Sequence, residues 1–135
     1  MNTKWRYVKP IKDEKSIELF EGMIGARLPE DFIEIVRVNN GGRPDRPVFD
    51  TDDVKEHVFK TLLSFNTDDL ENIFDTADSF IAAKSKYVPV ANDDFGNLIA
   101  YDKNSFKLYF LNHETDDVEY ISSSFSELME KLYDI

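Results

Sequence analysis

The sequence VANDDFGNLIAYD, at residues 90–102, decides how the second part of this chain folds. Apolar residues stand on both sides of a polar centre, residues 93–97, which holds two Asp residues and a Gly-Asn pair. In tight turns, Asp and Asn side chains bond to their own backbone, and glycine adopts the positive φ that many turns require. The stretch therefore predicts a β-hairpin with residues 93–97 at its tip.

Two chemical functions for the same stretch fail on the residue types present. A calcium loop of the EF-hand type needs oxygen ligands at its first and fifth positions and glycine at its sixth. With Gly96 at the sixth position, Ala91 and Phe95 fall where side-chain ligands are needed. Asp93 and Asp94 are adjacent, and adjacent side chains of an extended chain point to opposite faces, so they do not form an acid and base pair. The sequence therefore assigns no metal, cofactor or catalytic residue, and it predicts that the protein is not an enzyme.

From residue 87 onward, short apolar runs are separated by clusters of Asp, Asn, Gly and Ser: residues 87–91, 98–101, 108–111 and 118–121. This spacing is typical of a meander of antiparallel strands. Further upstream, residues 57–65 alternate with Phe59 and Leu63 on one face and Leu62 on the other. We expect a single strand there, buried on much of both faces.

Apolar residues at helical spacing predict helices in four other segments: residues 17–24, 28–38, 70–81 and 125–133. The acids at residues 68–71 are expected in the first turn of the third helix, where the helix dipole favours them. Ser124 and Glu127 form a capping box at the start of the last helix. The order of elements predicts a single α+β domain over residues 1–135. Its sheet is mostly antiparallel, with helices at both ends and one in the middle.

Charge is the most informative property of the composition. The chain has 135 residues, of which 27 are acidic and 16 basic, and its net charge is −11. Residues 1–44 carry nearly equal numbers of acids and bases, so the excess lies in residues 45–135. A negative field disfavours nucleic acid as a partner and attracts basic proteins. Composition supports equally well the simpler explanation that the acids keep the protein in solution.

The absence of cysteine excludes disulfides, thiolate zinc sites and thiol redox chemistry. Apolar runs reach only four residues, whereas a membrane-spanning helix needs about 18 or more. The opening MNTKWRYVKP lacks the apolar core of a secretory signal. We therefore expect a cytoplasmic protein without a membrane partner.

The remaining polar motifs are weak signals of function. His57 and His113 are the only histidines and lie in different segments, so no paired metal-ligand spacing or catalytic triad is marked. We expect both to be surface or rim histidines. Arg43 and Arg46 form a small positive spot that is expected to pair with nearby acids. The two glycines at residues 41–42 are expected to end a helix.

Four short motifs follow one another along the chain: LPEDF at residues 28–32, NGGRP at 40–44, VANDDFGN at 90–97 and SFSEL at 124–128. In this order and spacing they resemble the SMI1/KNR4 family of the SUKH superfamily, over residues 17–132. His113 and Glu114 also look like a turn of this family, although Asn112 stands where an acid is common.

The resemblance implies an α+β fold in which helices pack on a mostly antiparallel sheet, and it implies no catalysis. Bacterial members are similar to immunity proteins that neutralise a cognate toxin, often a nuclease, whereas fungal relatives act as regulatory scaffolds. The matching positions of this chain are core or turn residues, which mark the fold without locating a partner: Leu28, Pro29, Phe32, Gly41, Gly42, Gly96 and Phe125.

Charge and resemblance together lead to the hypothesis of an immunity protein whose acidic surface covers a basic, nuclease-type toxin in a stoichiometric complex. A regulatory scaffold that binds other proteins is the alternative, and a metal-independent hydrolase is the least favoured function. The toxin, the binding face and the oligomeric state stay open. The candidate contacts are acids expected to be exposed: Asp93, Asp94, Asp116, Asp117, Glu119, Asp68 and Asp69.

Overall fold

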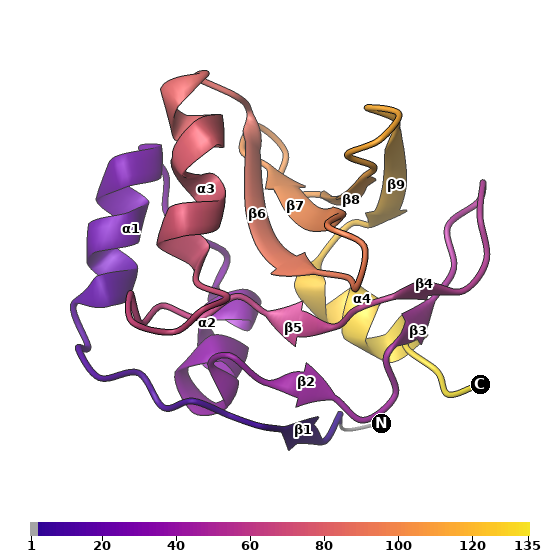
Figure 1. Ribbon diagram of the computed structural model, residues 1–135, viewed down its shortest axis with the longest axis horizontal. Helices are drawn as coiled ribbons and strands as arrows, with labels where there is room; N and C mark the ends of the chain where they lie inside the picture. The colour runs from indigo at the N-terminus through magenta and orange to yellow at the C-terminus, as the bar shows by residue number, and fades with distance from the viewer. Residues whose placement is uncertain (1–2) are drawn as a thin grey trace.

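The computed structural model describes residues 3–135, which form four helices and nine strands (Figure 1). The helices are α1 (Ser16–Ile24), α2 (Glu30–Asn39), α3 (Ile73–Ala82) and α4 (Phe125–Lys131). The first strands are β1 (Trp5–Arg6), β2 (Arg43–Pro44), β3 (Val48–Phe49), β4 (His57–Val58) and β5 (Thr61–Leu62). The later strands are β6 (Tyr87–Asn92), β7 (Leu98–Asp102), β8 (Leu108–Leu111) and β9 (Val118–Ser122).

The main sheet has the strand order β5-β6-β7-β8-β9, and all its neighbouring strands are antiparallel. Strands that are consecutive in the chain are therefore neighbours in the sheet, which confirms the predicted meander. Two further pairs, β1 with β2 and β3 with β4, form two-stranded antiparallel sheets. The fold class is α+β with mostly antiparallel sheet, as predicted.

The prediction of one strand over residues 57–65 is wrong. β4 pairs with β3, whereas β5 pairs with β6 in the main sheet, so the chain passes from one sheet to another between them. Phe59 lies at this crossing and is fully buried. The backbone N–H of Lys60 donates to the carbonyl of Asn92 at 2.8 Å. Apolar side chains are at least partly buried both before and after Phe59. The sequence therefore looks like one continuous buried strand, although the structure has two short strands in different sheets.

Helix α3 begins later than its apolar pattern predicts. Leu70 is 97% exposed, and the helix starts at Ile73. The preceding residue, Asn72, accepts a hydrogen bond from the backbone N–H of Asp75 at 2.8 Å. Such a cap satisfies a free amide of the first turn and fixes the start of the helix. The acids at residues 68–71 therefore lie in the loop before α3, and their predicted place in its first turn is wrong.

The other helices occupy their predicted segments within a few residues. Gly25 ends α1 in the left-handed conformation, with a φ of 71°. Helix α2 begins at Glu30, and Gly41 follows its end with a φ of 71°. At the start of α4, the hydroxyl oxygen of Ser124 accepts a hydrogen bond from the backbone N–H of Glu127 at 3.1 Å, which confirms the N-cap of the predicted capping box. The Glu127 carboxylate accepts a hydrogen bond from the hydroxyl of Ser123 at 2.5 Å.

A contiguous hydrophobic core lies between the helices and the inner face of the main sheet. Helices α1 and α3 lie side by side (Figure 1), and the rings of Phe20 and Phe74 join them with centroids 5.5 Å apart. Phe32 of α2 contacts Phe125 of α4 and Tyr101 of β7, at centroid distances of 5.2 and 5.7 Å. Helices α2 and α4 therefore pack together against the same face of the sheet.

Candidate functional site

The β6–β7 turn and the β8–β9 loop, which carry several of the predicted contact acids, are joined by hydrogen bonds. The backbone N–H of His113 donates to the side-chain oxygen of Asn97 at 3.0 Å. The ring nitrogen Nε2 of His113 lies 2.6 Å from the carbonyl oxygen of Phe95. The structure therefore holds the predicted hairpin tip and the next loop side by side at one end of the main sheet.

Asp93 shapes this turn and does not face solvent. Its carboxylate accepts hydrogen bonds from the backbone N–H groups of Phe95 and Asn97 at 2.8 and 2.9 Å, and from the side chain of Asn97 at 2.9 Å. The residue is buried. The expectation that Asp93 is an exposed contact is therefore wrong, whereas the prediction of a turn held by its own side chains is confirmed.

Asp94, Asp116 and Asp117 are exposed on the two joined loops, as expected. Asp94 lies 4.0 Å from the amine of Lys60, a distance at the limit of an ion pair. Asp116 adopts a φ of 61°, which is uncommon for a residue with a side chain but tolerated by Asp. These three carboxylates are the predicted acids that the structure leaves exposed on the two joined loops.

Sequence reasoning missed a polar cluster around Glu71, beside Asp94. The side chains of Lys60 and Asn92 lie 3.1 and 2.7 Å from its Oε2 atom, and Arg43 lies 3.8 Å from Oε1. Burial raises the pKa of Glu71, but hydrogen bonds from Asn92 and Lys60 outweigh burial and leave the pKa below its ordinary value. The prediction that Arg43 pairs with a nearby acid is confirmed.

Glu119 is buried, so the expectation that it is an exposed contact is wrong. Its Oε1 atom accepts a hydrogen bond from the hydroxyl of Thr51 at 2.6 Å and lies 3.0 Å from Nε2 of His57. Burial raises the pKa of Glu119, but the hydrogen bonds from Thr51 and His57 outweigh it and keep the pKa below its ordinary value. Glu119 therefore fastens the β3–β4 loop to the edge strand β9.

The two histidines differ from each other in their surroundings. The side chain of His57 is only 13% exposed, and its ring stacks on that of Phe110 with centroids 3.8 Å apart. His57 is therefore a partly buried histidine at the rim of the core and not an open surface residue. His113 is exposed, as predicted, although its ring is held at the β6–β7 turn.

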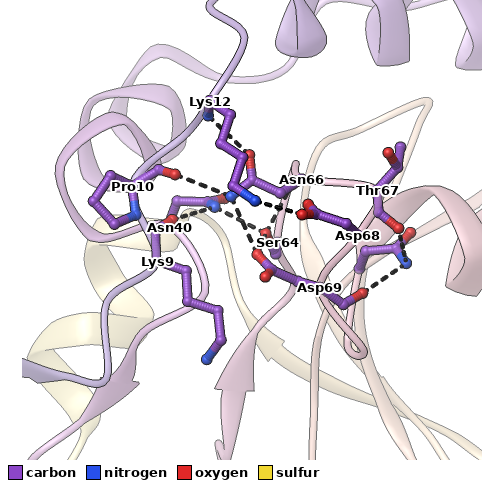
Figure 2. A network of polar contacts seen from close by, with 10 residues as sticks. Lys9, Pro10, Lys12, Asn40, Ser64, Asn66, Thr67, Asp68 and Asp69 are labelled. Carbon is purple, nitrogen blue, oxygen red and sulfur yellow. Dashed lines mark hydrogen bonds and ion pairs between the residues drawn. The ribbon is translucent and has the colours of Figure 1, made fainter.

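Asp68 and Asp69 belong to a separate polar network before α3 (Figure 2). Lys12 pairs with Asp68, and this hydrogen bond raises the pKa of Lys12 and lowers the pKa of Asp68. Asp69 accepts hydrogen bonds from the hydroxyl of Ser64 at 2.6 Å and from the amide of Asn66 at 3.1 Å. Asp68 remains exposed, as expected, whereas Asp69 is half-buried.

The same network fastens the N-terminal segment to the rest of the molecule (Figure 2). The side-chain amide of Asn66 donates to the carbonyl of Pro10 at 3.0 Å. Asn40 is fully buried, and its amide donates to the carbonyl of Lys9 at 2.7 Å and to the hydroxyl of Ser64 at 2.9 Å. Because these buried groups find partners within the protein, the network is best explained as structural.

Within residues 3–135, His, Asp and Glu side chains form no group of three that could hold a metal ion. A surface hollow of about 630 Å³ lies beside α1, and its lining mixes Glu14 and Glu18 with Lys15 and Arg37. Charges of opposite sign alternate there, so the hollow does not concentrate one sign of charge for a small ionic ligand.

The outer face of the main sheet is the second feature that sequence reasoning missed. Alternate residues of β6 to β9 point away from the core, and six of them are apolar or aromatic and at least partly exposed: Tyr87, Leu98, Tyr109, Leu111, Val118 and Tyr120. We call this set the tyrosine face. The sequence signal for this face lies in residues 108–111 and 118–122, where the residues that alternate with the buried positions are also apolar. The solvent-facing side of an antiparallel sheet usually carries polar residues at these positions.

Helices on one face of a five-stranded antiparallel sheet define the class of this protein as α+β with mostly antiparallel sheet. The chain belongs to the SMI1 / KNR4 family (SUKH-1), whose family model matches residues 12–131. The match covers nearly the whole chain and confirms the resemblance carried by the four motifs. No curated protein matches the chain. Among residues 3–135, no helix has the length and apolar character needed to cross a membrane.

Proposed function

We propose that the protein is an immunity protein that binds and neutralises a cognate bacterial toxin. Its family supports this function, because the SMI1 / KNR4 family includes immunity proteins. The net charge of −11 favours a basic partner, since opposite charges attract proteins before they touch. The proposal places the protein in the cytoplasm, assigns it no reaction and names no catalytic residue.

The joined loops at one end of the main sheet are the observation that carries the proposal. They present Asp94, Asp116 and Asp117, all exposed, on two hairpins that hydrogen bonds hold side by side. A nuclease toxin needs a cationic cleft to hold phosphate groups, and carboxylates that fill the cleft exclude the nucleic acid. One bound molecule then blocks one toxin, so inhibition is stoichiometric.

The test is a titration of the purified toxin domain encoded beside this gene. We expect a one-to-one complex at submicromolar concentrations, with an affinity that falls as NaCl is raised, because salt screens exposed charges. The double variant Asp116→Asn, Asp117→Asn should weaken binding about 10-fold and flatten the salt dependence. The double variant Asp52→Asn, Asp53→Asn is the matched control, since it removes two exposed acids from a different part of the surface.

Absence of binding at micromolar concentrations would contradict the immunity function. Binding that is indifferent to salt would contradict its electrostatic basis alone. In the first case a regulatory scaffold becomes the better explanation, and gene context separates the two. A large neighbouring reading frame with a variable C-terminal domain accompanies an immunity protein, whereas a scaffold needs no such neighbour.

A further inference from the structure

We propose that the tyrosine face is a docking surface for a protein whose contact region is apolar at its centre and basic at its rim. This inference deepens the proposed function, on which it rests for the identity of the partner. It adds to the acidic loops an apolar contact, which is made by residues that the charge argument does not use.

The tyrosine face is the side of the main sheet opposite the core. Ile99, Leu108 and Phe110 alternate along β7 and β8 with residues of this face, and their side chains are almost completely buried. Val118 and Tyr120 of β9 remain 45% and 42% exposed. The same strands therefore have one face packed against helices and one open face, and the open face is also apolar.

The strand register gathers these exposed side chains into one patch. Leu111 lies opposite both Leu98 and Val118, and Tyr109 lies opposite Tyr120. Directly opposed side chains on one face of a sheet are in contact distance, so the patch is continuous across β7, β8 and β9. A contiguous exposed apolar patch marks an interaction site more often than scattered single residues do.

Tyr109 stands at the centre of the patch. Its ring centroid lies 6.0 Å from that of Tyr87 and 5.8 Å from that of Tyr120, and both pairs are edge-to-face. Tyrosine offers a large, rigid apolar ring with a hydroxyl group for a polar contact, and it is enriched where proteins bind one another. The row of three rings therefore has the chemistry of a protein interface.

A groove of about 310 Å³ crosses the face beside α3. Apolar side chains line most of it: Phe80, Tyr87, Leu98, Leu111 and Val118. Four polar residues of the β8–β9 loop complete the lining: Asn112, His113, Asp116 and Asp117. An apolar side chain of a partner fits into this groove while a neighbouring Lys or Arg meets the two carboxylates.

The charge at the rim selects the kind of partner. Asp116 and Asp117 are exposed, so the rim at the β8–β9 loop is acidic. Lys86 lies beside the face, 5.3 Å from the centre of the Tyr87 ring, but it pairs with Asp102 at 3.5 Å. The base that lies over a ring of the tyrosine face therefore has its charge compensated, whereas Asp116 and Asp117 have no basic partner within ion-pair distance among residues 3–135.

A second copy of this chain is a poorer occupant of the same face. Each copy has a net charge of −11 and carries Asp116 and Asp117 beside its groove, so self-pairing brings like charges together. A basic protein is attracted to the same surface. Charge complementarity therefore favours a basic partner over a homodimer.

Site-specific photocrosslinking in the native cells tests the inference without assuming the partner's name. Tyr120→p-benzoylphenylalanine should crosslink to one basic protein, which mass spectrometry identifies. Val38→p-benzoylphenylalanine is the matched control, because Val38 is 72% exposed on α2. A crosslink at position 120 and not at position 38 supports the inference. Crosslinks to the same protein at both positions, or none at position 120, would overturn it.

The identified protein is then purified and titrated against variants of the full chain. Tyr109→Ala and Tyr120→Ala should each weaken binding about 30-fold, as truncation of a central interface tyrosine commonly does. Val38→Ala should leave the affinity unchanged. Tyr120→Phe keeps the ring and serves as the conservative variant, and urea unfolding verifies that every variant is folded. Unchanged affinity of the folded double variant Tyr109→Ala, Tyr120→Ala would overturn the inference, as would a homodimer that Tyr120→Ala dissociates.

These outcomes separate the docking surface from the immunity function. A crosslink to the neighbouring toxin supports both. Capture of a different basic protein supports the docking surface and contradicts the immunity function. Toxin binding that the tyrosine variants leave unchanged supports the immunity function and contradicts the docking surface.

Discussion

Tyr101 places a hydroxyl group without a hydrogen-bond partner in the hydrophobic core. Its hydroxyl group is the one buried side-chain polar atom in residues 3–135 without a hydrogen-bond partner. The ring lies edge-on to both Phe32 and Phe106. Burial, with a smaller effect from the carboxylate of Asp31, raises the pKa of this hydroxyl. The core therefore holds an unpaired polar group that its packing does not need.

Tyr101→Phe should raise the free energy of unfolding by about 1 kcal/mol, because folding no longer strips water from an unpaired hydroxyl. Urea unfolding at neutral pH measures the change. Tyr120→Phe, on the partly exposed face, is the control and should change stability little. A clear loss of stability in Tyr101→Phe would mean that the hydroxyl has a partner in solution.

Glu119 makes the stability of the fold depend on pH. Its pKa in the folded protein lies below the ordinary value of 4.5, so the ionised carboxylate favours folding. This stabilisation is complete above the ordinary value and is lost as the pH falls through the lower, folded pKa. Glu119→Gln should lower the free energy of unfolding by about 1–3 kcal/mol at neutral pH and flatten its decline in acid.

Urea unfolding at a series of pH values, from neutral into acid, measures this effect. Glu114→Gln removes an exposed carboxylate from the β8–β9 loop and should keep the pH profile of the unchanged protein. If the free energy of unfolding of Glu119→Gln fell in acid as steeply as that of the unchanged protein, the Glu119 carboxylate would not be the cause of the pH dependence.

At the scale of elements, Asn40 joins segments that are distant in the sequence. It follows α2, its amide donates to the carbonyl of Lys9 and the hydroxyl of Ser64, and its oxygen accepts from the backbone N–H of Phe65 at 2.9 Å. Asn40→Ala should lower the free energy of unfolding by about 3 kcal/mol, because it leaves several buried groups unpaired. Thermal and urea unfolding measure the loss. Asn104→Ala, in an exposed turn, is the control, and equal effects of the two substitutions would contradict this role.

Elements with local signals could be predicted from the sequence. The turn at Asp93 and Gly96 and the cap at Ser124 depend on residues only a few positions apart, so one sequence contains the whole signal. The break between β4 and β5 could not be predicted in the same way. Residues 57–65 are apolar throughout because two sheets and the core all contact them, and periodicity does not reveal where the pairing partner changes.

At the scale of the whole molecule, composition predicts that the electrostatic field of the protein is negative. It does not predict which acids are exposed and available to contact a partner. The carboxylate of Asp93 accepts hydrogen bonds within its own turn. The carboxylate of Glu119 contacts the ring of His57, which lies 62 residues earlier in the chain. Pairs at such separations are made by the fold and leave no mark in a single sequence. Of the acids predicted as contacts, the structure leaves Asp94, Asp116 and Asp117 as the candidates. The tyrosine face becomes visible only when the strand register is known.

The alternation of side chains along β8 and β9 has a consequence for diversification. Leu108, Phe110 and Ile121 are buried in the core, whereas residues 109, 111, 118 and 120 lie on the opposite side of the sheet. A library randomised at the latter positions should keep its scaffold while sampling new targets. Specificity in such a protein can then evolve in steps that leave its architecture untouched.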